Sequence, residues 1–238
     1  MLSNVRFREQ PGVAVPSASV DGVFPAPLIQ TRTTPPSEIT KRGFDMCIAM
    51  LALFLLLPLI SLAVVLLLLA QGRPILIRHE RVGRGGRRFR CFKLRTMVEN
   101  SDEVLAELLA RDGEARREWT ASRKLKLDPR VTPIGKVLRK SSLDELPQLY
   151  NILVGEMSFV GPRPIVQDEV VYYGAAINDY YKVRPGLTGL WQVSGRSDTS
   201  YDDRVSLDSR YVQDRSFPLD LGIILRTVPA ILRSKGSY

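Results

Sequence analysis

The stretch MCIAMLALFLLLPLISLAVVLLLLA, residues 46–70, decides the fold because it runs for 25 residues without a charged side chain. At about 1.5 Å per residue, a helix of this length crosses a hydrocarbon core of roughly 30 Å. The stretch is too long, and lies too far from the N-terminus, for a secretory signal peptide. The sequence therefore predicts a membrane segment early in a chain of 238 residues.

Two features favour a hairpin that enters and leaves one side of the membrane over a helix that spans it. Pro58 stands in mid-run, where it removes a backbone hydrogen bond and kinks a helix. Cations flank both ends, with Lys41 and Arg42 on one side, and positive flanks stay in the cytoplasm. Because prolines also occur in spanning helices, both topologies stay open and re-entry is favoured. Asp45 at the entry lies one turn from Lys41 and Arg42, which offset its charge.

The basic excess of the chain is concentrated just after this segment. The net charge is +9, and residues 73–95 hold nine Lys or Arg side chains against one acid, Glu80. Such a patch indicates a polyanionic partner, which means lipid head groups, nucleic acid or a phosphorylated substrate. The two cysteines, Cys47 and Cys91, and the single His79 have no spacing typical of a disulfide framework or a zinc site. A reduced domain facing the cytoplasm is expected.

Three regions follow from composition and periodicity. Residues 1–40 contain six prolines and no apolar periodicity, which is typical of a disordered tail. Residues 41–72 are expected to form the membrane helix broken at Pro58, with re-entry the favoured topology, and residues 73–238 a cytoplasmic, membrane-associated domain. In this domain we expect strands at 75–81 and 88–97, helices at 101–110, 116–127, 201–212 and 219–233, a helix that starts at Pro133 with Thr132 as its N-cap, and loops at 155–164 and 184–189.

The expected fold class is α+β and mostly helical, with amphipathic helices at the membrane interface. The helix at 219–233 suits a membrane surface or a packed core equally well. The glycines at 83–86 lack the lysine and Ser/Thr of a phosphate-binding loop, so they are expected to form the turn of a hairpin.

The stretch SSLDELPQL, residues 141–149, places two adjacent carboxylates, Asp144 and Glu145, after a basic run. Ser142 followed by Glu145 is the spacing of a capping box, which explains both acids without any chemistry. Pro147 weakens that interpretation, since a proline near the fifth position of a helix costs roughly 3 kcal/mol. Strain of this kind often marks a functional site.

Adjacent carboxylates on a helix point about 100° apart, which suits a division of labour. One can attack phosphorus while the other holds a cation, and hard oxygen ligands favour Mg²⁺ or Mn²⁺. Guanidinium groups match phosphate oxygens, so arginines close to the pair or in Gly/Pro-rich loops favour a diphosphate substrate. These arginines are Arg139, Arg163, Arg184 and Arg196.

Five sequence blocks follow one another between Lys41 and the C-terminus, over nearly two hundred residues. They are KRGFD at 41–45, FKLRTM at 92–97, SLDELPQL at 142–149, VGPRP at 160–164 and RPGLTGLWQVSGR at 184–196. In these blocks the chain resembles the monotopic phosphoglycosyl transferases of bacteria. Several long blocks in one order are far more specific than a single motif.

The resemblance implies a reaction in which a sugar-1-phosphate, with galactose or glucose as the expected sugar, passes from a UDP-sugar to undecaprenyl phosphate and UMP is released. This would be the first membrane step of exopolysaccharide synthesis, at the cytoplasmic face of the bacterial inner membrane. Asp144 would form a covalent phosphosugar intermediate, and Glu145 would help to hold Mg²⁺. The remaining implied contacts are phosphate for Arg139, the nucleotide-sugar pocket for Arg163, Arg184 and Arg196, and an acidic substrate-binding position for Asp208.

The expected partners are therefore the UDP-sugar, undecaprenyl phosphate and anionic membrane lipids, with no nucleic acid, and an oligomer is possible. The competing hypothesis is a membrane-anchored scaffold whose basic patch grips anionic lipid or nucleic acid, with Ser142 and Glu145 only capping a helix. It leaves Pro147 and the arginine-bearing loops unexplained.

Overall fold

The structure is a computed structural model that describes residues 37–122, 125, 127–194 and 200–232. All of these residues belong to one compact unit, Thr33–Tyr238. The tail predicted for residues 1–40 lies outside the described residues up to position 36, and so does Arg196. Residues 38–40 belong to the first helix instead of a tail.

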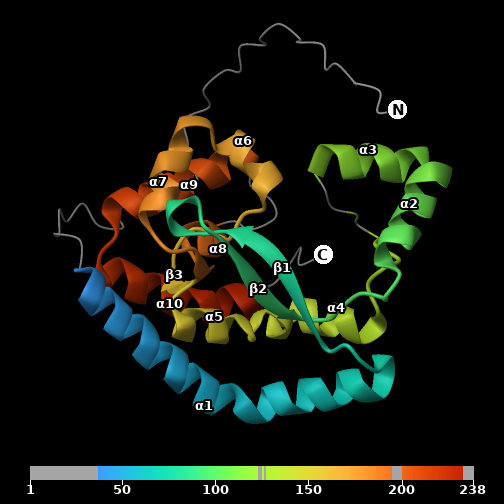
Figure 1. The fold of residues 1–238 in the computed structure, drawn as a ribbon, viewed down its shortest axis with the longest axis horizontal. Helices are drawn as coiled ribbons and strands as arrows, with labels where there is room; N and C mark the ends of the chain where they lie inside the picture. Colours follow the sequence, from blue (N-terminus) through green and yellow to red (C-terminus); the bar gives the residue numbers. More distant parts are fainter. Residues whose placement is uncertain (1–36, 123–124, 126, 195–199, 233–238) are drawn as a thin grey trace, which may run out of the picture. The chain divides into compact units, whose positions relative to one another are not determined.

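Helix α1, Glu38–Gln71, carries the apolar run and is 34 residues long. Ser37 caps its start by accepting a hydrogen bond from the Thr40 amide, and the chain leaves it at Gly72 with φ 66°. The backbone remains helical across Pro58, and the helix changes direction near its middle (Figure 1). The predicted proline kink is therefore a bend in one continuous helix. Among the described residues, α1 alone is long and apolar enough to cross a membrane.

The first turns of α1 are held to the rest of the chain by buried charges. Asp45 is 1% exposed and accepts hydrogen bonds from Lys41 Nζ at 2.7 Å, Ser158 Oγ at 2.8 Å and the Phe159 amide at 3.1 Å. Lys41 Nζ also lies 3.0 Å from a carboxylate oxygen of Asp220. The expected pairing of Asp45 with Lys41 is confirmed, and it fastens the helix to the domain.

Two arginines, one near each end of α1, donate hydrogen bonds to the last carbonyl groups of a helix. Arg42 donates to the carbonyls of Ile152 and Leu153, the latter at 2.7 Å. Arg95 is 5% exposed and donates to the carbonyls of Gln71 and Gly72, where α1 ends. The last carbonyl groups of a helix have no hydrogen-bond partner inside the helix. A cation there donates hydrogen bonds to them and interacts favourably with the negative end of the helix dipole. Both ends of α1 are therefore attached to the same domain.

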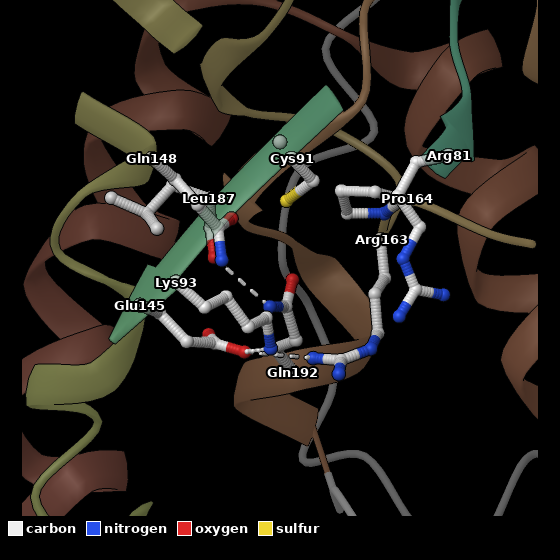
Figure 2. Close-up of a pocket in the computed structure, with 10 residues that line it drawn as sticks. Arg81, Cys91, Lys93, Glu145, Gln148, Arg163, Pro164, Leu187 and Gln192 are labelled. Carbon is white, nitrogen blue, oxygen red and sulfur yellow. Dashed lines mark hydrogen bonds and ion pairs between the residues drawn. The ribbon is translucent and has the colours of Figure 1, made fainter. Parts of the chain in front are cut away.

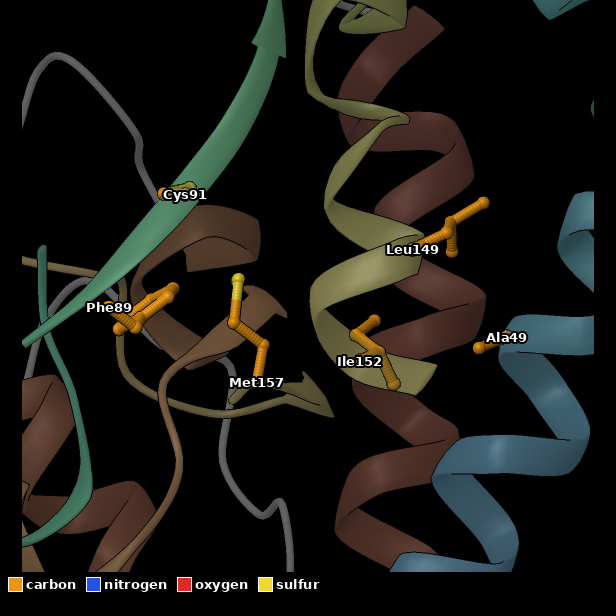
Figure 3. Close-up of a cluster of buried hydrophobic side chains, with 6 residues drawn as sticks. All are labelled: Ala49, Phe89, Cys91, Leu149, Ile152 and Met157. Atoms are coloured by element: carbon orange, nitrogen blue, oxygen red, sulfur yellow. The ribbon is translucent and has the colours of Figure 1, made fainter. Parts of the chain in front are cut away.

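Between these anchors, α1 packs through a narrow face of small and aliphatic side chains. Ala49 lies beside α5, which carries Leu149 and Ile152, in the cluster of Figure 3, and Leu67 packs with Leu94 and Leu138 farther along. The rest of the helix surface is apolar and exposed. The side chains on this outer face include Met50, Leu51, Phe54, Leu55, Leu57, Leu59, Leu62, Val65, Leu66 and Leu69.

The predicted hairpin is confirmed. Strands β1, Leu76–Val82, and β2, Arg88–Leu94, pair antiparallel in the register Leu76 to Leu94 and Val82 to Arg88. A short 3₁₀ turn, η2 (Arg84–Gly86), joins them, and Gly85 and Gly86 have φ of 65° and 75°. The glycines supply this positive φ, which is the role expected of turn glycines.

The next helices begin close to where the sequence places them. They are α2 (Ser101–Arg111), α3 (Gly113–Ser122) and α4 (Pro133–Lys140). Thr132 Oγ1 accepts a hydrogen bond from the Gly135 amide at 3.0 Å, so the predicted N-cap of α4 is confirmed. Gly135 lies directly against the Thr96 backbone, which leaves no room for a Cβ atom.

The remaining elements are short until the last two helices. They are η3 (Leu143–Glu145), α5 (Gln148–Val154), β3 (Ser158–Val160), η4 (Gln167–Glu169), α6 (Val170–Tyr173), η5 (Gly174–Ala176), α7 (Ile177–Lys182), β4 (Gly186–Thr188), α8 (Leu190–Ser194), α9 (Tyr201–Asp214) and α10 (Phe217–Leu232). Strands β3 and β4 form a parallel pair where the sequence predicted only loops. The described chain is thus mostly helical with two two-stranded sheets, which agrees with the predicted fold class.

Helix α10 has one buried face and one exposed apolar face. Asp220 and Ile223 are buried against the domain, at 1% and 2% exposure. Leu221, Leu225 and Val228 are more than half exposed on another face, at 51%, 66% and 60%. The helix therefore packs on the core and still presents an apolar stripe outward.

Replacing Asp45 with asparagine should loosen α1 from the domain. The amide keeps the shape and leaves Lys41 and Ser158 facing an uncharged group, and breaking a buried pair costs about 3 kcal/mol. For a chain of this size that corresponds to a melting temperature lower by roughly 6–12 °C in detergent. Glu80→Gln removes the exposed pair with Arg88 and should shift the melting temperature by less than about 2 °C. Equal shifts in the two variants would contradict this account of the anchor.

Candidate active site

The two carboxylates lie on a 3₁₀ turn between two helices. Helix α4 ends at Lys140 with Ser141 as its C-cap, and Ser142 then adopts φ 57° and ψ 17°, in the left-handed region. The Ser142 side chain makes no capping hydrogen bond, so the predicted capping box is wrong. The turn η3 follows and carries Asp144 and Glu145.

Pro147 was predicted to lie inside a helix but lies just before one. It has φ −59° and directly precedes α5, so it breaks no hydrogen bond inside a helix. The strain inferred from Pro147 is therefore wrong. The strained position is Ser142, since a non-glycine residue in the left-handed region costs about 1 kcal/mol.

Asp144 is a nearly buried acid at 7% exposure. Burial, followed by the negative charge of Glu145, raises the pKa of Asp144 to about 6. Lys93, Arg139 and Arg163 oppose that rise. At neutral pH the carboxylate is mostly ionised, although burial disfavours its charged form.

Glu145 has the opposite electrostatic surroundings. Its carboxylate lies 2.7 Å from Lys93 Nζ and 3.6 Å from Arg163 Nη1. Burial acts to raise its pKa, but Lys93 and then Arg163 outweigh it and lower the pKa to about 2. Neighbouring acids with pKa values pushed apart are typical of a site in which the two have different tasks.

A hollow opens beside Glu145 (Figure 2). Its walls carry three cations, Arg81, Lys93 and Arg163, and the thiol of Cys91, whose pKa is raised by burial. Residues far apart in the chain meet here. The full lining is Arg81, Cys91, Lys93, Glu145, Gln148, Arg163, Pro164, Gly186, Leu187 and Gln192.

Lys93 and Arg81 are site residues that the sequence analysis did not single out. The register pairs Ile77 with Lys93 and Arg81 with Phe89, and alternate strand residues share a face. The hairpin therefore turns Arg81, Cys91 and Lys93 to one side. Alternation along the strand that contains FKLRTM was the available signal, but nothing in the sequence showed that this face meets the acidic pair.

The predicted arginines separate into two groups. Arg139 donates from Nε to Thr96 Oγ1 at 2.9 Å, and its charge acts on Asp144. Arg163 reaches Glu145 in the hollow. Arg184 instead donates to the Gly155 carbonyl at 2.9 Å and lies 3.2 Å from Glu38, in a second hollow that shares no lining residue with the first.

Asp208 does not line the hollow. It is 1% exposed and accepts a hydrogen bond from the Tyr173 hydroxyl at 2.8 Å. Burial raises its pKa to about 7, and the charges of Arg204 and Arg163 oppose that rise. Arg204 stacks on Trp191 at 5.0 Å, and Arg163 lies over the same ring at 6.0 Å. Asp208 is therefore linked to the hollow only through the charges of these two arginines.

The acidic pair is a partial ligand set for a divalent cation. In the described part of the chain, no group of three or more His, Cys, Asp or Glu side chains could hold a metal ion. Mg²⁺ commonly takes one or two carboxylates and completes its shell with water and substrate phosphates, so Asp144 and Glu145 fit that ion. A cation would also relieve the repulsion that raises the pKa of Asp144. The cations of the hollow suit a phosphorylated ligand, and Glu145 is the carboxylate that lines the hollow, with Asp144 next to it in the chain.

The chain is similar to bacterial proteins of known family. The family described as bacterial sugar transferase matches residues 36–234. The exopolysaccharide production protein ExoY of Sinorhizobium fredii is 52% identical over 204 residues, which cover 86% of this chain and 90% of that protein.

Two relatives carry more specific names. The undecaprenyl-phosphate galactose phosphotransferase of Salmonella typhimurium is 48% identical over 85% of this chain, which spans 42% of that longer protein. The UDP-glucose:undecaprenyl-phosphate glucose-1-phosphate transferase of Caulobacter vibrioides is 40% identical over 84% of this chain and 73% of its own length.

Titration of the metal-free protein should separate the two acids. Carbon-13 NMR of labelled carboxyl groups is expected to give Asp144 a midpoint near pH 6, because burial disfavours its ionised form. Glu145→Gln should lower that midpoint, since it removes a neighbouring negative charge. Lys93→Gln should raise the pKa of both acids, since Lys93 lowers both. A midpoint for Asp144 that neither substitution moves would refute the assigned electrostatics.

Proposed function

The chain belongs to the bacterial sugar transferase family and is a transferase, and we propose that it transfers a sugar-1-phosphate from a UDP-sugar to undecaprenyl phosphate, with release of UMP. Galactose and glucose are the sugars proposed, in line with the names of the relatives from Salmonella and Caulobacter. The reaction would be the first membrane step of exopolysaccharide synthesis.

The observation that carries this proposal is the asymmetric acidic pair beside a basic hollow. Asp144 has a raised pKa and is ionised at neutral pH, whereas Glu145 is fixed by Lys93 and Arg163. Carboxylates form covalent intermediates with phosphorus, and the cations match a diphosphate. One acid is thus available for attack while the other is committed to binding.

Two displacements complete the reaction. An oxygen of the Asp144 carboxylate attacks the sugar-bearing phosphorus of the donor, and the bond from that phosphorus to the bridging oxygen breaks. UMP leaves with the electron pair. A phosphate oxygen of undecaprenyl phosphate then attacks the same phosphorus, the bond to Asp144 breaks and the carboxylate is restored. No side chain has to supply a proton in either step.

The side chains around the hollow would bind and orient the donor. Arg163 and Arg81 would hold its phosphate oxygens, and Trp191 keeps Arg163 in place. Lys93 keeps Glu145 ionised. When bound by Glu145 and Asp144, Mg²⁺ would supply charge neutralisation at the phosphates, and Mn²⁺ offers the same chemistry.

We also propose that α1 is a re-entrant membrane helix at the cytoplasmic face of the bacterial inner membrane. Attachment of both ends to one domain supports this, since a spanning helix would need one end on the far side. The apolar outer face around the bend would lie among the lipid chains. The basic hairpin would meet anionic head groups, at about 1 kcal/mol for each cation.

Replacing Asp144 with asparagine should abolish both half-reactions. UMP release and lipid-linked sugar are each expected to fall by at least about a thousandfold, because the amide is a poor nucleophile. Asp179→Asn, which removes an ordinary helical ion pair with Lys182, should keep the wild-type rate. Substantial turnover by Asp144→Asn would reject Asp144 as the nucleophile.

Glu145→Gln tests the metal role within the same assay. The variant should need a higher Mg²⁺ concentration for half-maximal UMP release, because one carboxylate ligand has been replaced. An unchanged dependence on Mg²⁺ would remove Glu145 from the proposed ligand set.

Topology can be tested with single cysteines at the two ends of α1, in a chain whose exposed Cys47 has been changed to serine. Ser37→Cys and Arg73→Cys should both react with an impermeant thiol reagent added outside inverted vesicles, which expose the cytoplasmic face. Neither should react when the reagent reaches only the opposite face. Labelling from opposite sides would contradict re-entry and support a spanning helix.

A further inference from the structure

Glu38, the first residue of α1, is bound by three arginines from three separate segments. Its carboxylate lies 2.7 Å from Arg84 in the β1–β2 turn and 3.2 Å from Arg184 before β4. Arg215, between α9 and α10, is 3.4 Å away. Three guanidinium groups and one carboxylate leave this cluster with a net charge of +2.

Glu38, Arg184 and Arg215 of the cluster line the second hollow. The other acids of this hollow already have partners. Lys41 lies between Asp45 and Asp220, and Asp220 also accepts a hydrogen bond from Tyr211 at 2.8 Å. The surplus positive charge therefore remains at the Glu38 end, where the guanidinium groups are 27–43% exposed.

From this arrangement we propose that Arg84, Arg184 and Arg215 form a second anion site, which takes the phosphate of an anionic phospholipid in place of Glu38. A phosphate offers more acceptor oxygens than a carboxylate, so it suits three convergent guanidinium forks better. Glu38 acts as the resident counter-charge when no lipid is present.

Position argues for a membrane lipid that does not react. A reacting phosphate has to reach Asp144, yet this hollow shares no lining residue with the one beside Glu145. The cluster lies at the start of α1, so in the proposed membrane orientation it stands at the level of the head groups. The choice of a lipid source rests on that orientation, and the site also accounts for the placement of Arg184 away from the acidic pair.

The test is lipid selectivity of the full-length protein. The protein is equilibrated in vesicles of equal phosphatidylglycerol and phosphatidylcholine, and retained lipids are counted by native mass spectrometry. Wild type should retain phosphatidylglycerol with roughly thirtyfold enrichment, as expected for two surplus cations near a membrane surface. Arg184→Ala and the double variant Arg84→Ala/Arg215→Ala should lose the enrichment. Glu38→Gln should increase it, which a loss of folding would not do.

Controls separate the possible outcomes. Arg88→Ala removes an exposed arginine that pairs only with Glu80 in the described residues and should leave the enrichment unchanged. Asp144→Asn should also leave it unchanged, so failure of the transfer chemistry and failure of this site can be told apart. Equal enrichment in Arg184→Ala and Arg88→Ala would overturn the site. Loss of the enrichment in millimolar inorganic phosphate would overturn the assignment to a lipid.

Discussion

The attachment of α1 at both of its ends is the constraint on which the rest of the structure depends. Asp45 and Arg42 hold the first turns to β3 and to the end of α5, and Arg95 holds the last carbonyls. Asp45 and Arg95 are almost fully buried, so separating them from their partners would strand polar groups away from water. An exposed apolar helix is thereby fixed in one orientation on a polar domain.

The position of Asp144 and Glu145 depends on the packing of α1 against the domain. Ile152 of α5 packs on Ala49 of α1, and α5 begins three residues after Glu145. The hairpin that supplies Lys93 packs on the same cluster through Phe89 and Cys91. Helix α1, the acidic pair and the cations of the hairpin therefore belong to one packed unit. In the proposed reaction this unit would bring a water-soluble donor and a lipid acceptor to the same carboxylate.

Sequence reasoning succeeded where the signal is local. The β1–β2 hairpin follows from strand composition and turn glycines, and α4 from the Thr132–Pro133 start. It failed where distant segments decide the conformation. The parallel pair β3–β4 is three residues long on each side, too short to show alternation. The 141–149 stretch looked like one capped helix but is a left-handed residue, a 3₁₀ turn and a new helix, because it has to pack between α4, β2 and α1. Arg184 was expected beside the acidic pair but contacts Gly155 and Glu38, whereas Lys93 was not singled out and contacts Glu145. Only the folded chain shows which arginine or lysine faces the acids.

The central claim is that Asp144 carries the sugar phosphate between donor and acceptor. The most direct measurement supplies the wild-type protein with UDP-sugar and no lipid acceptor, quenches the mixture and maps the modified peptide by mass spectrometry. The account predicts a sugar phosphate on the peptide that contains Asp144, one UMP released for each modified chain, and loss of the adduct when undecaprenyl phosphate is added. UMP release that needs the lipid acceptor, with no modified peptide at any time, would contradict it.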